Sequence, residues 1–279
     1  MNIKGSLRWA TCAAVVIVLA GCGSDGDIKI SADDNSTVTN PPGDGGGGTN
    51  PCASYQEEGT TNLIQGSFDG SNCTYSSAFV GDSNPLTQDV TIPFISGVHI
   101  FQDTLQVGEN FDGTDPSIIP PAGGAGPTQT IEPGNTLVWS DSTDYLLINR
   151  GSQLIANGSA AAPITFTVFT DAVTGTADPE AVQLWGGVVI NGNGITNKCS
   201  DEQRDNNTCH VLSEGKPSNY GGSDNADSSG SLNYVVVKHT GFEVVTGDEL
   251  NGVTFNAVGS GTQIENLQTY STFDDGIEF

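Results

Sequence analysis

Two stretches of the chain repeat one another, and this internal similarity constrains the fold more than any other feature. Residues 232–243 can be laid over residues 264–275 at an offset of 32, and residues 252–255 over residues 276–279 at an offset of 24. The difference is accounted for if residues 244–251 are an insertion. A 24-residue unit with three short strands and no helix is what one coil of a parallel β-helix needs, because each coil hydrogen-bonds only to its neighbours.

The repeat also predicts which side chains face inward and which face outward. Apolar residues at alternate positions of the two units should stack inside the solenoid, and Lys238 should lie over Tyr270 on the outside. The predicted inward stacks are Val235 over Leu267, Val237 over Thr269, Val253 over Ile277 and Phe255 over Phe279.

The remainder of the chain is also typical of strands. Short runs rich in Val, Ile, Thr and aromatic residues alternate with Gly, Asn, Asp and Ser, and helical periodicity is almost absent, so we expect an all-β fold. The chain stops at Phe279 inside a predicted strand, and we expect further coils of a longer protein. The predicted organisation is a lipoprotein signal peptide at 1–21, a lipid-anchored flexible linker at 22–51, an N-terminal β subdomain or cap at 52–128 and a parallel β-helix at 129–279.

The first 22 residues have the order of a secretory signal. Lys4 and Arg8 precede an apolar run at 9–19, which ends at Leu-Ala-Gly-Cys22. This ending resembles the lipobox of bacterial lipoproteins, in which the cysteine is acylated and becomes the new N-terminus; an ordinary signal peptide with a chance cysteine is the alternative. Gly23 and Ser24 favour the outer membrane, with the leaflet undetermined, and the Gly-, Pro- and Asp-rich residues that follow predict a disordered tether.

The charge balance excludes several classes of partner. Of the eight basic residues, two lie in the signal peptide, so the mature chain carries six against 33 acidic residues, a net charge of 6 − 33 = −27. This charge argues against nucleic acid, anionic lipid and, without a bridging cation, polyanionic sugars.

Four cysteines remain after removal of the signal peptide and lipidation of Cys22. Because an exported chain favours disulfides, we expect the pairs Cys52–Cys73 and Cys199–Cys209, each closing a local polar loop. A zinc site is the alternative, but Cys199, Cys209 and His210 lack the usual spacing of zinc ligands.

Several segments together resemble a known family. They are residues 146–158, 163–167, 185–192, 239–243, 249–255 and 274–279. This combination resembles the right-handed parallel β-helix, or pectate-lyase-like, outer-membrane lipoproteins of Gram-negative bacteria. The resemblance covers about residues 130–279; it implies the fold and says little about activity.

A group of acidic residues is a candidate calcium site. The register brings Glu243 over Asp275 beside the insertion, and Ca²⁺ takes six to eight oxygen ligands. The alternative, which the sequence favours, is that Asp-Asp-Gly simply makes a turn. The candidate ligands are Glu243, Asp248, Glu249, Asp274, Asp275 and Glu278.

Lys238, His239 and Tyr270 gather at a neighbouring corner and are candidates for a catalytic base. The resemblance implies such a role, because β-helix polysaccharide lyases use a basic residue or a tyrosine to remove a proton, often with calcium. The missing positive charge and an ordinary outer-face stack of Lys238 on Tyr270 favour a structural role instead.

The sequence therefore predicts a cell-envelope lipoprotein whose β-helix is a binding or structural module, with a glycan or an outer-membrane protein as partner. The insertion at 244–251 and the excursion at 199–209 supply side loops for binding. A calcium-assisted polysaccharide lyase or glycoside hydrolase, with its site partly beyond residue 279, is the alternative. Motifs for a serine nucleophile elbow, a phosphate loop and a zinc protease are absent from the sequence.

Overall fold

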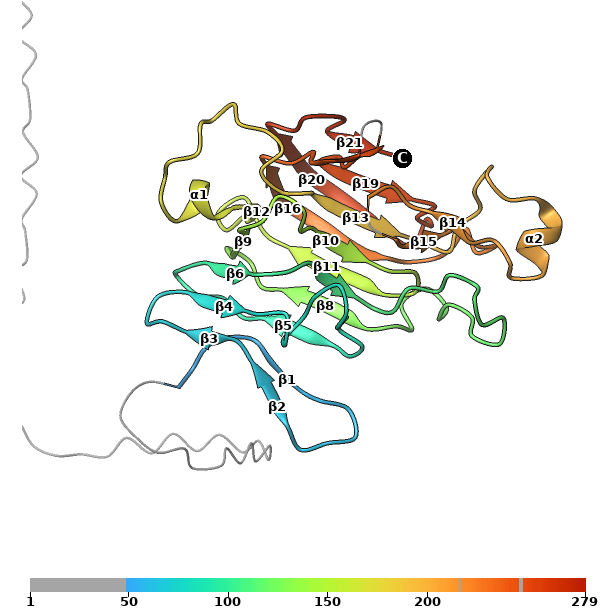
Figure 1. Ribbon diagram of the computed structural model, residues 1–279, viewed down its shortest axis with the longest axis horizontal. Helices are drawn as coiled ribbons and strands as arrows, with labels where there is room; N and C mark the ends of the chain where they lie inside the picture. Colours follow the sequence, from blue (N-terminus) through green and yellow to red (C-terminus); the bar gives the residue numbers. More distant parts are fainter. Residues whose placement is uncertain (1–48, 216, 246–247) are drawn as a thin grey trace, which may run out of the picture. The chain divides into compact units, whose positions relative to one another are not determined.

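The computed structural model describes residues 49–215, 217–245 and 248–279. In this part of the chain, short parallel strands stack coil upon coil, and the predicted parallel β-helix is confirmed (Figure 1). The predicted signal peptide, the predicted lipidation site Cys22 and nearly all of the predicted tether lie outside the described residues.

One side of the solenoid, which we call face C, takes one strand from each of five coils in the described chain. All its strand pairs are parallel. Its strands, in order, are β7 (Leu105–Val107), β10 (Leu146–Ile148), β13 (Val188–Asn191), β19 (Val253–Asn256) and β21 (Ile277–Glu278).

The other two sides, faces A and B, belong to one curled sheet. They are joined by the long strands β16 (Gly230–Lys238) and β20 (Gln263–Tyr270), which pair with each other and whose two halves lie on different faces. Face A contains the first halves of β16 and β20 with β5 (Val90–Ile92), β8 (Thr128–Ile131) and β11 (Gln153–Asn157). Face B contains their second halves with β3 (Ser67–Phe68), β4 (Cys73–Tyr75), β6 (His99–Phe101), β9 (Thr136–Trp139) and β12 (Ile164–Val168).

The corner between faces A and B is made by single residues in the left-handed conformation. Tyr234 and Asn266 have φ values of 49° each and occupy equivalent places on consecutive coils. The Asn266 amide donates to Asn233 Oδ1 at 2.9 Å, which links the two coils at this corner. The same bend on an earlier coil carries Gly158, whose N–H donates to the Asn233 carbonyl. A left-handed residue therefore makes this bend on two consecutive coils, and a glycine occupies it on the earlier one.

The register predicted from the repeat is confirmed. Val235 pairs with Leu267, Lys238 with Tyr270, and Val253 with Ile277. Neighbouring coils are, however, not equally long. The sequence distance between stacked residues is 24 for the pair Val253–Ile277, but 76 for the pair Leu154–Gly230. The extra chain lies in excursions between strands, which leave the stacking intact.

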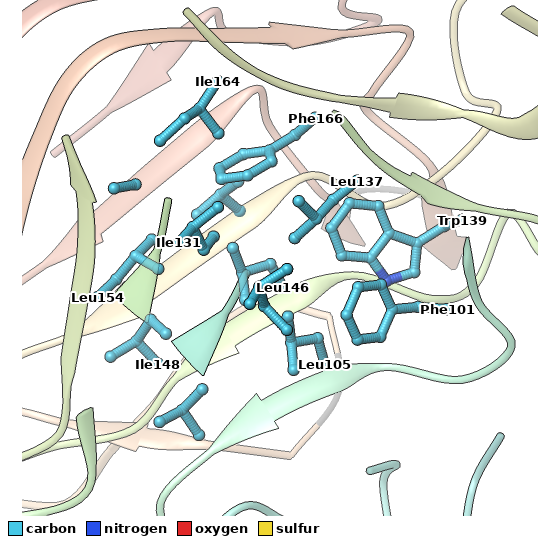
Figure 2. Packing of buried hydrophobic residues seen from close by; sticks show 14 of the residues in the cluster. Phe101, Leu105, Ile131, Leu137, Trp139, Leu146, Ile148, Leu154, Ile164 and Phe166 are labelled. Atoms are coloured by element: carbon cyan, nitrogen blue, oxygen red, sulfur yellow. The ribbon is translucent and has the colours of Figure 1, made fainter. Parts of the chain in front are cut away.

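The core is a continuous file of inward-facing side chains (Figure 2). Tyr75, Phe101 and Trp139 lie in register on face B, with ring centroids 4.8 and 5.6 Å apart. Trp139 also stacks on Trp185 at 4.3 Å, and the Trp185 indole N–H donates to the carbonyl of Lys238 at 2.7 Å. Large aromatic residues bury much apolar area per residue, so this file is a main source of stability.

The residues predicted as an N-terminal cap, 52–128, supply both a cap and coils. β1 (Ser54–Gln56) and β2 (Leu63–Gln65) form an antiparallel pair, whereas β4 and β6 continue the parallel sheet of face B. The predicted disulfide Cys52–Cys73 is confirmed and joins the cap to the first coil. Beside it, buried His99 contacts Tyr75 Oη at 2.9 Å through Nδ1, and burial lowers the pKa of His99 to about 4.

The remaining elements are short and lie in the excursions. They are α1 (Phe169–Ala172), α2 (Asp201–Asp205), the hairpin of β14 (Val211–Leu212) with β15 (Asn219–Tyr220), and the hairpin of β17 (Glu243–Val245) with β18 (Asp248–Glu249). None of the helices in the described residues is long and apolar enough to cross a membrane.

Candidate functional site

The structure places Lys238 beside a carboxylate that the sequence analysis missed. Its Nζ lies 2.6 Å from Oδ2 of Asp171, which also accepts a hydrogen bond from Thr167 Oγ1 at 2.7 Å. Burial alone would raise the pKa of Asp171, but the hydrogen bonds from Lys238 and Thr167 and the charge of Lys238 lower it overall. Asp171 therefore stays ionised at neutral pH and holds Lys238 as its ion-pair partner.

His239 lies next to this ion pair but is shielded from solvent. Its side chain is buried, its Nδ1 lies 2.7 Å from the carbonyl oxygen of Ala181, and its Nε2 lies 3.6 Å from Asp171 Oδ1. Nδ1 must carry the proton to make the Ala181 contact. A general base has to reach the proton that it removes, and this imidazole is instead enclosed by the chain.

Tyr270 is the most accessible of the three base candidates. Its side chain is 42% exposed, and its ring packs edge-on against that of His239, with centroids 6.5 Å apart. Lys238, His239 and Tyr270 thus gather at one corner, where Asp171 from α1 joins them. No periodicity linked Asp171 to Lys238, because the two are 67 residues apart and α1 belongs to an excursion.

The acidic residues predicted to bind calcium make separate contacts with different partners. Glu243 pairs with Glu249 across the β17–β18 hairpin, while Glu278 accepts a hydrogen bond from the Asn251 amide at 2.7 Å. The backbone N–H of Asp275 donates to Asn251 Oδ1, and Asp274 lies next to it in the bend before β21. The side chain of Asp248 lies outside the described residues.

No group of three or more His, Cys, Asp or Glu side chains forms a metal-binding arrangement in the described part of the chain. The carbonyls of Asp275 and Gly276 accept hydrogen bonds from the N–H groups of Gly252 and Val253 on the coil below. The Asp-Asp-Gly segment thus docks its backbone on the preceding coil. A calcium site at these residues stays a prediction.

A polar cavity of about 380 Å³ lies on the outside of face C. Thr254 and Glu278 come from paired strands of that face, and Tyr220 comes from the hairpin that stands opposite. Burial, followed by the charges of Glu278 and Glu214, raises the pKa of Tyr220, so its hydroxyl remains protonated and able to donate. The polar residues lining the cavity are Thr196, Asn197, Lys198, Glu214, Tyr220, Thr254, Asn256 and Glu278.

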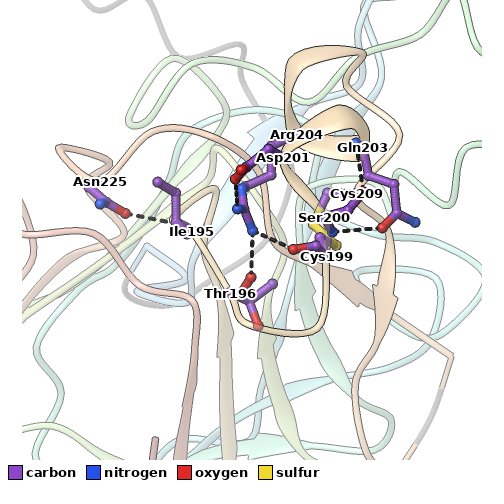
Figure 3. Close-up of polar contacts among 9 residues, drawn as sticks. All are labelled: Ile195, Thr196, Cys199, Ser200, Asp201, Gln203, Arg204, Cys209 and Asn225. Carbon is purple, nitrogen blue, oxygen red and sulfur yellow. Dashed lines mark hydrogen bonds and ion pairs between the residues drawn. A yellow bond between two sulfur atoms is a disulfide. The ribbon is translucent and has the colours of Figure 1, made fainter.

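The wall of this cavity is an excursion held rigid at its base (Figure 3). The predicted disulfide Cys199–Cys209 is confirmed, and α2 starts with a capping box between Ser200 and Gln203. Arg204 at the end of α2 donates to the carbonyls of Thr196 and Cys199 and pairs with Asp201. The sequence predicted a binding loop here, but it could not show that the loop folds back over face C.

A comparison with models of protein families shows the family to which this chain belongs. A family model described as a pectate-lyase-like beta helix domain matches residues 117–279, more than half of the chain. The chain belongs to this family. No curated protein and no solved structure matches the chain. The family therefore accounts for the stacked coils, and the chemistry of the surface has to be argued from the residues.

The ion pair of Asp171 should stabilise the excursion that carries α1. We predict that Asp171→Asn lowers the free energy of unfolding by about 1–2 kcal/mol, because it leaves Lys238 unpaired in a partly buried place. Urea unfolding would measure this change. Lys238→Met alone and together with Asp171→Asn completes a double-mutant cycle. A coupling energy of zero would show that the two side chains do not stabilise each other.

Proposed function

We propose that this chain is an outer-membrane lipoprotein, anchored through Cys22, whose β-helix binds a glycan without catalysing its cleavage. The observation that carries the proposal is the cavity on the outside of face C, which combines a tyrosine ring with hydroxyl, amide and carboxylate groups. Such a mixture of one aromatic face and several hydrogen-bonding groups suits the alternating apolar and hydroxylated surfaces of a sugar.

The charge of the chain narrows the class of glycan. At a net charge of −27 for the mature chain, with Glu214 and Glu278 in the cavity wall, a polyanionic sugar would be repelled. Lys198 is the one cation among the described residues that line the cavity. A neutral or amine-bearing glycan is therefore the favoured ligand.

The state of two of the three candidate bases supports binding over catalysis, whereas the third, Tyr270, is exposed. Lys238 is engaged by Asp171, and His239 is buried with its Nδ1 proton directed at a backbone carbonyl. Neither is free to take a proton from a substrate.

Two features support export and anchoring. The N-terminal sequence ends its apolar run at Leu-Ala-Gly-Cys22, and both cysteine pairs of the folded domain are oxidised, as is usual outside the cytosol. For the predicted tether of about 30 residues, a random coil would have a dimension of about 30 Å.

The anchor is tested by Cys22→Ala. We predict that the wild-type chain, expressed in a Gram-negative host, partitions into the detergent phase and gains the mass of a diacylglyceryl group on Cys22. The variant, lacking the thiol that is acylated, should stay in the aqueous phase. Detergent partitioning of Cys22→Ala equal to that of the wild type would contradict lipidation at this residue.

Ligand binding is tested on an array of neutral, amine-bearing and uronate glycans. Tyr220→Ala removes the ring from the cavity, and we predict a loss of about tenfold in affinity, equivalent to roughly 1.4 kcal/mol. Tyr270→Ala is the matched control, because it removes a tyrosine from face B instead. Equal losses for both variants would argue against the cavity, and release of products from uronate polymers would favour the enzymatic alternative.

A further inference from the structure

The guanidinium of Arg150 closes the base of the hairpin that walls the cavity. Arg150 is buried, with 2% of its surface exposed, and its Nη1 donates to the carbonyls of Cys209 at 3.0 Å and Gly221 at 2.7 Å. These two residues stand just before β14 and just after β15. One side chain of the β-helix body thus holds both ends of the hairpin that carries Leu212, Glu214 and Tyr220 into the cavity wall.

The second arm of the guanidinium reaches an imidazole. Nη2 of Arg150 lies 2.8 Å from Nδ1 of His210 and also donates to the carbonyl of Phe111. Burial lowers the pKa of Arg150 only to about 10, so it is a cation at neutral pH and every polar atom of its guanidinium is a donor. Nδ1 of His210 also lies 3.1 Å from the carbonyl oxygen of Phe111, to which a protonated Nδ1 would donate. Facing the guanidinium donor at 2.8 Å, however, Nδ1 takes part in the Arg150 contact only when it carries no proton.

The surroundings of His210 disfavour its protonated form. Burial, followed by the charge of Arg150, lowers the pKa of His210, while the carbonyls of Phe111 and Asn207 and the charge of Asp112 oppose this shift in part. Arg150 and Asp112 are the charged groups of the described residues that act on this imidazole. The cation is in direct contact with Nδ1, whereas Asp112 makes the smallest contribution.

We propose that His210 is a pH-dependent latch on the glycan cavity. Neutral His210 accepts a hydrogen bond from Arg150 and keeps the β14–β15 hairpin closed over face C. Protonated His210 is repelled by Arg150 and releases the hairpin. The inference rests on the proposed function in one respect, that the cavity is the binding site. Binding is then strong at neutral pH and is lost on acidification.

The direction of the effect follows from linkage. The closed hairpin favours neutral His210, so the open state binds more protons at pH values below the ordinary histidine pKa of about 6.5. Closure is fully effective above that pH and weakens as the pH falls through it. At pH 5.0, about 1.5 units lower, the opening equilibrium rises by up to about 30-fold.

The test is amide hydrogen exchange of the full chain at pH 7.5 and 5.0, with exchange times scaled to equal intrinsic rates. In the wild type, opening of the amides in β14 and β15 should rise by up to about 30-fold at the lower pH, as derived above. In His210→Asn the rise should vanish, because Oδ1 can accept from Arg150 and does not titrate. Amides of β9 and β12 are the internal control, and titration of buried His99 affects both proteins equally.

An equal rise in both proteins, or no rise in the wild type, would overturn the latch. Should His210→Asn fail to fold, an NMR titration of the wild-type His210 ring decides, since a midpoint at or above 6.5 contradicts the proposal. Exchange needs no ligand, so the two proposals can fail separately. Glycan binding that does not depend on pH would contradict the latch but not the proposed function. Opening that depends on His210, in a protein that binds no glycan, would contradict the proposed function but not the latch.

Discussion

The parallel stacking of short strands in register is the constraint on which the rest of this structure depends. Each strand satisfies its backbone hydrogen bonds on the coils above and below, and each inward side chain packs on its equivalent in the next coil. Val107, Ile148, Ile190 and Phe255 form such a file on face C. Because only the strands must align, the chain between them is free to vary in length.

The excursions are the consequence of that freedom, and the chemistry of the surface lies in them. The segment after β12 brings Asp171 to Lys238, and the segment after β13 brings Tyr220 to the outside of face C. Each excursion is fixed to the solenoid by polar contacts of its own: an ion pair in the first case, and Arg150 with the Cys199–Cys209 disulfide in the second. A rigid core with variable loops is a common way to build a binding surface.

Arg150 shows how a buried charge can hold such an excursion. A buried cation costs much free energy unless hydrogen bonds replace its water. Here three backbone carbonyls and one imidazole supply bonds to the two terminal nitrogens, while the buried Nε has no partner among the described residues. The arrangement ties residues 111, 150, 209 and 221 together, although they come from three separate segments. In the proposed latch, it also makes the β14–β15 hairpin sensitive to the protonation of His210.

The sequence could predict features that depend on the repeat or on residues close together in the chain. It could not predict contacts between an excursion and a distant coil. The offset of 32 put Lys238 over Tyr270 because both belong to equivalent strands, and the structure has this pair. The disulfides were also predictable, because each closes a short loop. Asp171, Arg150 and Tyr220 carry no periodic signal, since their partners are set by how excursions fold back. Their roles follow from tertiary contacts, which a single sequence does not encode in its spacing.

The register of the last coils is the central claim, and a cross-linking measurement tests it most directly. Val236 and Gln268 are paired neighbours on face B, at positions whose side chains point outward. In a Val236→Cys, Gln268→Cys variant that keeps the native disulfides, a short bismaleimide should join the two thiols within one chain, as mass mapping would show. The pair Val236→Cys, Ser260→Cys, which a uniform 24-residue coil would bring together, should stay unlinked. Linking of the second pair and not the first would contradict the stacking on which this account is built.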